Sequence, residues 1–94
     1  MTRKDIVQRL SKRTDISPAQ ATHALDGIID IISEALAAQE PVMLRGFGAI
    51  KTVHTPERIA RDIRRKRVVT IPARMQVKFK AYDQLKLRIN GNNL

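Results

Sequence analysis

Residues 42–54 read Val-Met-Leu-Arg-Gly-Phe-Gly-Ala-Ile-Lys-Thr-Val-His, and this stretch decides the fold. Its two flanks, 42–45 and 49–54, are rich in β-branched and other apolar residues, which favour strands. Between them, two glycines flank Phe47. Glycine tolerates positive φ without strain, so this Gly-Phe-Gly segment predicts a tight reversal. The stretch is therefore expected to form two strands joined by a short turn.

The downstream sequence predicts two more strand segments and a helix. Residues 68–71 read Val-Val-Thr-Ile, which is extended in tendency. Residues 75–80 alternate apolar and polar side chains, as a half-buried strand does. Residues 82–89 carry apolar side chains four apart and are followed by Asn-Gly, which predicts a short final helix.

Two helices are predicted upstream. Thr2 and Asp5 have the spacing of a capping box, and a first helix is expected to run to about Arg13. Residues 17–20 read Ser-Pro-Ala-Gln, a stronger start signal, because serine caps the helix, proline needs no amide partner there, and glutamine bonds back. The second helix is expected to reach about Gln39, before Glu-Pro stops it.

Charge is concentrated in one segment. The 94 residues hold 18 Lys+Arg and 9 Asp+Glu, a net charge of +9. Residues 51–80 alone hold ten basic and two acidic side chains, whereas residues 1–50 are balanced. Such a concentration is typical of a surface that binds a polyanion, with nucleic acid the first expectation and an anionic membrane surface the second.

Several classes of function are excluded by composition. The chain has no cysteine, so disulfide scaffolds, thiolate metal sites and cysteine nucleophiles are excluded. No apolar run approaches a membrane span or a signal peptide, which predicts a cytoplasmic protein. Three aromatic residues are too few for a platform that stacks single-stranded bases. His23 and His54 lack partners at catalytic or metal spacing, so neither an enzyme nor a cofactor nor a metal site is expected.

Asp26, Asp30 and Glu34 lie four residues apart and so share one face of the second helix. Such a row has the geometry for a metal or an acid/base pair, but further ligands are missing and a solvated acidic stripe is favoured. Pairing of this stripe with Arg9 and Arg13 of the first helix is expected.

The chain resembles the HU/IHF family of bacterial DNA-bending proteins over nearly its whole length. The features that carry the resemblance, in order, are Ser17 and Ala21 at the two-helix start, Gly46-Phe47-Gly48, Ile71-Pro72-Ala73, and Phe79-Lys80 leading to Leu85-Lys86. The resemblance implies one α+β domain over residues 1–94. It has two N-terminal helices, a three-stranded antiparallel sheet with an extended β-ribbon arm at about 55–70, and a short C-terminal helix.

The resemblance also implies an intertwined homodimer or heterodimer. Its core is expected to include Phe47 and Phe79, and pairing would bury surplus isoleucines such as Ile28 and Ile32. Removing the polar stretch 55–70 leaves about 78 residues for a core, which is marginal for a lone chain and independently favours pairing.

The implied function is architectural. The arms of such a dimer embrace the minor groove of double-stranded DNA and bend or compact it with low sequence specificity, in association with the nucleoid. Arginine suits this task because its planar, weakly hydrated head enters a narrow electronegative groove. The expected DNA-binding residues are Arg58, Arg61, Ile63, Arg64, Arg65, Lys66 and Arg67 on the arm and Arg74, Lys78 and Lys80 on the sheet, with Lys4, Arg45 and Lys86 as weaker candidates.

The arm tip departs from the family pattern, because Asp62 replaces an asparagine, Ile63 occupies the place of a wedging proline, and the turn glycine is absent. Ile63 is expected either to wedge between base pairs or to pack against the other arm strand. Loss of the glycine argues against positive φ, whereas Asp62 suits the first position of a type I turn. Asp62 must pair with a neighbouring arginine, or it would repel phosphate.

Three alternatives remain open at this point. Residues 64–67 form either a DNA-binding cluster or a solvated charge run or transport signal. A site-specific, IHF-like bending subunit is a second alternative, and a structural protein that binds double-stranded RNA or acidic partners is a third.

Overall fold

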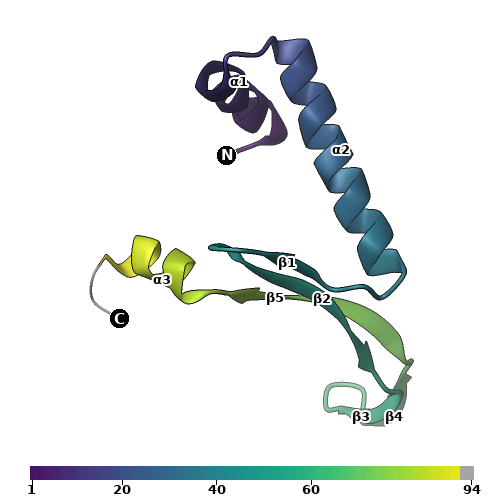
Figure 1. Ribbon diagram of the computed structural model, residues 1–94. Coiled ribbons are helices and arrows are strands. Elements are labelled where there is room, and N and C mark those ends of the chain that lie inside the picture. Colours follow the sequence, from purple (N-terminus) through teal and green to yellow (C-terminus); the bar gives the residue numbers. More distant parts are fainter. Residues whose placement is uncertain (92–94) are drawn as a thin grey trace. The chain divides into compact units, whose positions relative to one another are not determined.

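The computed structural model describes residues 1–91 and shows an α+β chain with strands in two antiparallel sheets (Figure 1). Its elements are α1 (Arg3–Thr14), α2 (Pro18–Ala37), β1 (Val42–Leu44), β2 (Gly48–Thr55), β3 (Arg58–Asp62), β4 (Arg67–Ile71), β5 (Arg74–Ala81) and α3 (Asp83–Asn90). Two units make up the chain, residues 1–35 and residues 36–94. The predicted fold class is confirmed.

The first helix begins with the predicted capping box. The Thr2 hydroxyl accepts the Asp5 backbone N–H at 3.4 Å, and the Asp5 carboxylate accepts the Thr2 N–H at 2.9 Å. The helix ends where Asp15 takes the left-handed conformation, with φ of 55°. Both ends of α1 are therefore determined by local hydrogen bonds and backbone geometry.

The second helix begins with a reciprocal pair of bonds between Ser17 and Gln20, as predicted. The Ser17 N–H donates to the Gln20 side chain at 3.0 Å, and the Gln20 N–H donates to the Ser17 hydroxyl at 3.1 Å. The predicted end at Gln39 was too late, because α2 ends at Ala37. Gln39 has φ of 60° and donates its N–H to the Leu36 carbonyl, which closes the helix.

An ion pair joins α1 to α2, but its basic member differs from the prediction. Arg3 pairs with Asp26, and both side chains are about half exposed. Arg9 and Arg13, the predicted partners, make no ion pair within residues 1–91. An exposed pair of this kind contributes little to stability.

The larger sheet has the strand order β1-β2-β5, all antiparallel. The turn between β1 and β2 is the predicted reversal, in which the Phe47 N–H donates to the Leu44 carbonyl at 2.9 Å. Gly46 supplies the positive φ, 80°, that this turn requires. The Tyr82 N–H donates to the Phe47 carbonyl at 2.9 Å, so the same turn anchors the start of α3.

Gly48 is needed for space and not for positive φ, in contrast to the prediction from the Gly-Phe-Gly segment. A Cβ at this position would lie 2.5 Å from the Lys80 carbonyl oxygen and 2.7 Å from the Phe79 ring. The Phe79 ring in turn packs against Phe47, with ring centroids 5.4 Å apart. Glycine therefore permits the close approach of β2 to β5 at this end of the sheet.

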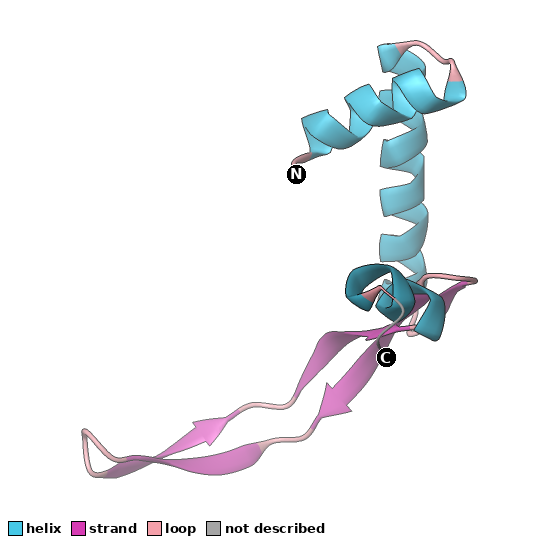
Figure 2. Cartoon of the chain, turned by 90° about the vertical axis from the view of Figure 1, so that its left-hand side faces the viewer, coloured by secondary structure: helices cyan, strands magenta, loops and turns pink. Residues whose placement is uncertain are grey.

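The smaller sheet is a two-stranded ribbon of β3 and β4, which continues from the ends of β2 and β5 and closes in a loop (Figure 2). Thr55 pairs with Arg74, and the next pair is Arg58 with Ile71. Between these pairs lie Pro56 and Pro72, one on each side. Proline has no N–H to donate, so both ladders are interrupted there. We call residues 58–71 the outer ribbon.

Candidate nucleic-acid interface

One face of the larger sheet is basic. Directly opposed residues of an antiparallel pair share a face, and the side chains alternate along each strand. The register therefore places Lys51 of β2 on the same face as Arg74, Lys78 and Lys80 of β5. All four side chains are exposed. The other face carries large apolar side chains, with Ile50 directly opposite Phe79.

Two lysines face each other across this basic surface, because Lys51 is directly opposite Lys78. Like charges in this position destabilise a sheet in water, by about 0.2–1 kcal/mol. A polyanion bound to this face would remove that repulsion. Lys51 was not among the binding residues expected from the sequence, because its place opposite Lys78 is known only from the strand register.

The outer ribbon presents cations on both of its faces. Arg58 is opposite Ile71 and Arg67 is opposite Asp62, which places these two arginines on one face. Arg61 is opposite Val68 on the other face. All three arginines are exposed. A strand pair with cations on both faces suits a groove with phosphates along both walls.

The ribbon closes through a four-residue loop, Ile63 to Lys66, between the paired residues Asp62 and Arg67. Ile63 is 83% exposed, so it is not packed against the other arm strand, which was one of the two interpretations of this residue. Lys66 has φ of 51°, which corrects the expectation that the loop avoids positive φ once glycine is absent. The left-handed conformation costs a non-glycine residue about 1 kcal/mol.

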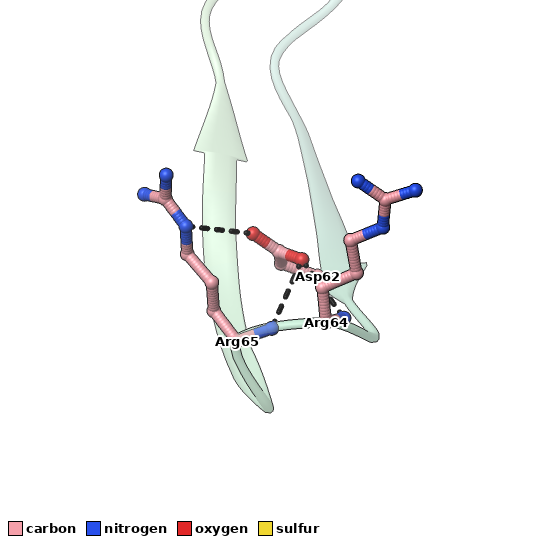
Figure 3. Close-up of polar contacts among 3 residues, drawn as sticks. All are labelled: Asp62, Arg64 and Arg65. Atoms are coloured by element: carbon pink, nitrogen blue, oxygen red, sulfur yellow. Dashed lines mark hydrogen bonds and ion pairs between the residues drawn. The ribbon is translucent and has the colours of Figure 1, made fainter.

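Asp62 organises this loop (Figure 3). Its Oδ1 accepts the backbone N–H of Arg64 at 3.1 Å and that of Arg65 at 3.3 Å. Its Oδ2 lies 3.9 Å from the Nε of Arg65. The predicted pairing of Asp62 with a neighbouring arginine is thus present. Asp62 also stands first in the turn, as expected, and its side chain accepts the N–H groups of the residues that follow.

The weaker candidates lie apart from these surfaces along the chain. Lys4 lies in α1, Arg45 lies in the turn between β1 and β2, and Lys86 lies in α3. All three are exposed.

Two other kinds of feature are absent from the part of the chain that the structure describes. Within residues 1–91, no three His, Asp or Glu side chains gather in a way that would hold a metal ion. Over the same residues, no helix has the length and apolarity needed to cross a membrane.

The fold and these surfaces define a class, that of α+β proteins in which an antiparallel sheet extends into a basic β-ribbon. The chain belongs to the bacterial DNA-binding protein family, which comprises HU and integration host factor, and the family model matches residues 1–90. It is 34% identical to the integration host factor subunit beta of Methylococcus capsulatus over 92 residues, which covers 97% of each chain. It is 32% identical to the DNA-binding protein HU of Thermotoga maritima, covering 95% of this chain and 99% of that protein.

A solved structure gives the same fold. A cocrystal of Anabaena HU with DNA superposes with a TM-score of 0.88 at 22% identity, covering 97% of this chain and 99% of that one. The likeness extends over the helices, the sheet and the outer ribbon, since almost the whole chain is covered.

Proposed function

We propose that this protein is a non-enzymatic architectural protein that binds double-stranded DNA chiefly through its phosphates and bends the duplex with low sequence specificity. The observation that carries the proposal is the outer ribbon, which presents exposed cations on both faces and at its loop. Contacts of cations with phosphates provide sequence-independent affinity, because they release condensed counterions. In this proposal the ribbon enters the minor groove, while the basic face of the sheet follows the backbone.

The residues proposed to contact DNA share exposure and a place on the ribbon or the basic face. They are Arg58, Arg61, Ile63, Arg64, Arg65, Lys66, Arg67, Lys51, Arg74, Lys78 and Lys80. A solvated charge run explains residues 64–67 less well, because the loop that holds three of them is closed by defined hydrogen bonds.

Ile63 is proposed to supply the wedge of a bending protein. An apolar side chain inserted at a base step unstacks it at a cost of about a few kcal/mol, offset by the larger surface that bent DNA contacts. We expect Ile63→Ala to reduce the bend angle measured by fluorescence energy transfer between the duplex ends. Ile59→Ala is the matched control, because Ile59 is also an exposed ribbon isoleucine, 75% accessible, but lies away from the loop. Equal bending by both variants and wild type would eliminate the wedge.

We propose a homodimer as the active form. In the single chain, the apolar face of the larger sheet is poorly covered, since Val77 and Phe79 are 62% and 50% exposed. Phe47 and Ile28 are exposed to a similar extent. These residues, together with Ile32, are proposed to contribute to the dimer core, because exposed large apolar side chains favour association. Sedimentation equilibrium of the purified chain should give twice the chain mass of 10.6 kDa.

The proposed setting is the bacterial nucleoid, where an architectural protein compacts chromosomal, plasmid or phage DNA. The functional test compares binding to nicked, kinked and intact duplexes of one sequence. A bending protein prefers the predistorted duplexes, since part of the deformation energy is already spent. Equal affinity for all three would argue against bending.

Two alternatives are separated by binding measurements on other nucleic acids. Affinity that is about 1,000-fold higher for enriched sequences than for random duplex would favour a site-specific bending subunit. Stronger binding to double-stranded RNA than to DNA would favour the structural alternative, because the deep, narrow major groove and shallow minor groove of RNA are recognised by shape and 2′-hydroxyl contacts.

A further inference from the structure

The loop of the outer ribbon has a negative charge at the point where the ribbon is most basic. Asp62 is followed directly by Ile63, Arg64 and Arg65, and its side chain is only 30% exposed. A carboxylate in this place weakens binding to phosphate by simple electrostatics. Asp62 is therefore expected to have a structural role in the loop that offsets this weaker binding.

The hydrogen bonds show what that role is. Both Arg64 and Arg65 donate their backbone N–H groups to the same carboxylate oxygen of Asp62. Because the Asp62 side chain accepts two successive backbone N–H groups, it holds the loop closed. The same two bonds fix the direction in which the side chains of Arg64 and Arg65 point away from the backbone. Figure 3 shows the two arginine side chains pointing away from each other, on either side of the ribbon.

We infer that Asp62 is a positioning residue, which presets the loop so that Arg64 and Arg65 reach the two phosphate walls of the minor groove with the exposed Ile63 beside them. The inference rests on the proposed function and deepens it. The B-DNA minor groove is only about 6 Å wide, so two cationic side chains that diverge from one narrow ribbon can contact the phosphates on both walls at once. A loop that is already closed spends less conformational entropy on binding than one that is ordered by DNA.

Two variants separate this role from the effect of charge. Asp62→Asn and Asp62→Ala both remove the negative charge, but only asparagine keeps an oxygen that can accept the two amides. Charge alone predicts that both variants bind DNA equally well and more tightly than wild type. Positioning predicts that Asp62→Asn bends DNA as wild type does, whereas Asp62→Ala binds about fivefold more weakly than Asp62→Asn and bends DNA less.

A control variant and a DNA-free readout complete the test. Glu57→Gln removes an acidic charge near the base of the ribbon without touching the loop, and should strengthen binding slightly. Hydrogen exchange of the Arg64 and Arg65 amides, measured without DNA, should be faster in Asp62→Ala than in wild type or Asp62→Asn. Circular dichroism should show the same thermal transition for all three proteins, since the loop is remote from the larger sheet.

Equal bending and equal affinity of Asp62→Asn and Asp62→Ala, beside a wild type that bends DNA, would overturn the inference alone. Equal amide exchange in the two variants would also overturn it, whatever their affinity. A wild type that neither binds nor bends duplex DNA would overturn the proposed function, and the role of Asp62 on DNA with it.

Discussion

The larger sheet and the outer ribbon are continuous along the chain but are stabilised differently. The sheet has three strands, one apolar face, and a close approach at Gly48 that leaves no room for another side chain. The ribbon has two strands joined by five register pairs, with arginines on both faces. A two-stranded hairpin is marginally stable alone in water. The comparison indicates that the sheet provides stability, while the ribbon, whose side chains are mostly exposed, can present arginines on both faces.

The largest expected effect is on binding and comes from the ribbon. Replacing Arg64, Arg65 and Lys66 by glutamine should lower the affinity for duplex DNA by about 100-fold or more, because each lost phosphate contact forfeits counterion release in both protomers of the proposed dimer. The free energy of unfolding should stay within about 0.5 kcal/mol of wild type, as for other exposed substitutions. Fluorescence anisotropy and urea denaturation measure the two quantities.

The matched control neutralises three cations of α1. Arg9, Lys12 and Arg13 are exposed and lie outside the proposed interface. Their replacement by glutamine removes the same charge and should change the affinity much less. Equal losses in the two triple variants would show that net charge, and not the ribbon, determines binding.

A second prediction concerns the sheet and should affect stability. Gly48→Ala places a methyl group against the Lys80 carbonyl and the Phe79 ring, and should destabilise the fold by about 1–3 kcal/mol, the usual cost of overpacking. Gly27→Ala is the control, because its added methyl group would have no neighbour within 4 Å and helical alanine is favoured over glycine by about 0.5–1 kcal/mol. Urea denaturation that gives Gly48→Ala wild-type stability would refute the close-approach argument.

The smallest effects should appear on the basic face of the sheet, with opposite signs for stability and binding. Lys51→Gln removes the repulsion with Lys78 and should stabilise the DNA-free protein by about 0.2–1 kcal/mol. The same variant should bind DNA about three- to tenfold more weakly, since one phosphate contact per protomer is lost. Thermal unfolding without DNA and anisotropy with DNA measure the two changes. An increase in both the stability of the DNA-free protein and its affinity for DNA would show that DNA binds away from this face.

Local signals in the sequence were sufficient for the helices and for the individual strands of the larger sheet, whose arrangement was implied by the family resemblance. The capping residues Thr2 and Ser17 indicated the helix starts, because capping depends on neighbours three residues away. The alternation in 75–80 indicated β5, and the glycine at position 46 indicated the turn. These features depend on short-range chemistry, which a sequence displays directly.

In the outer ribbon, the β-branched run 68–71 indicated β4, whereas β3 and the geometry of the loop were beyond such local signals. The strand β3, Arg58–Asp62, is mostly polar and has no apolar alternation, so only the resemblance to a family indicated the arm. The opposition of Lys51 and Lys78 depends on strand register, which links residues far apart in the chain. The positive φ of Lys66 and the two amides on Asp62 arise from closing the ribbon between Asp62 and Arg67.

The most direct test of a ribbon-borne, phosphate-directed interface is the dependence of duplex affinity on salt. If the dimer neutralises about 8–10 phosphates, log K should fall against log salt concentration with a slope of about −7 to −9. The slope should become shallower when Arg64, Arg65 and Lys66 are neutralised, and remain near the wild-type value when the three α1 cations are neutralised. A nearly flat response of the wild-type protein would contradict the account.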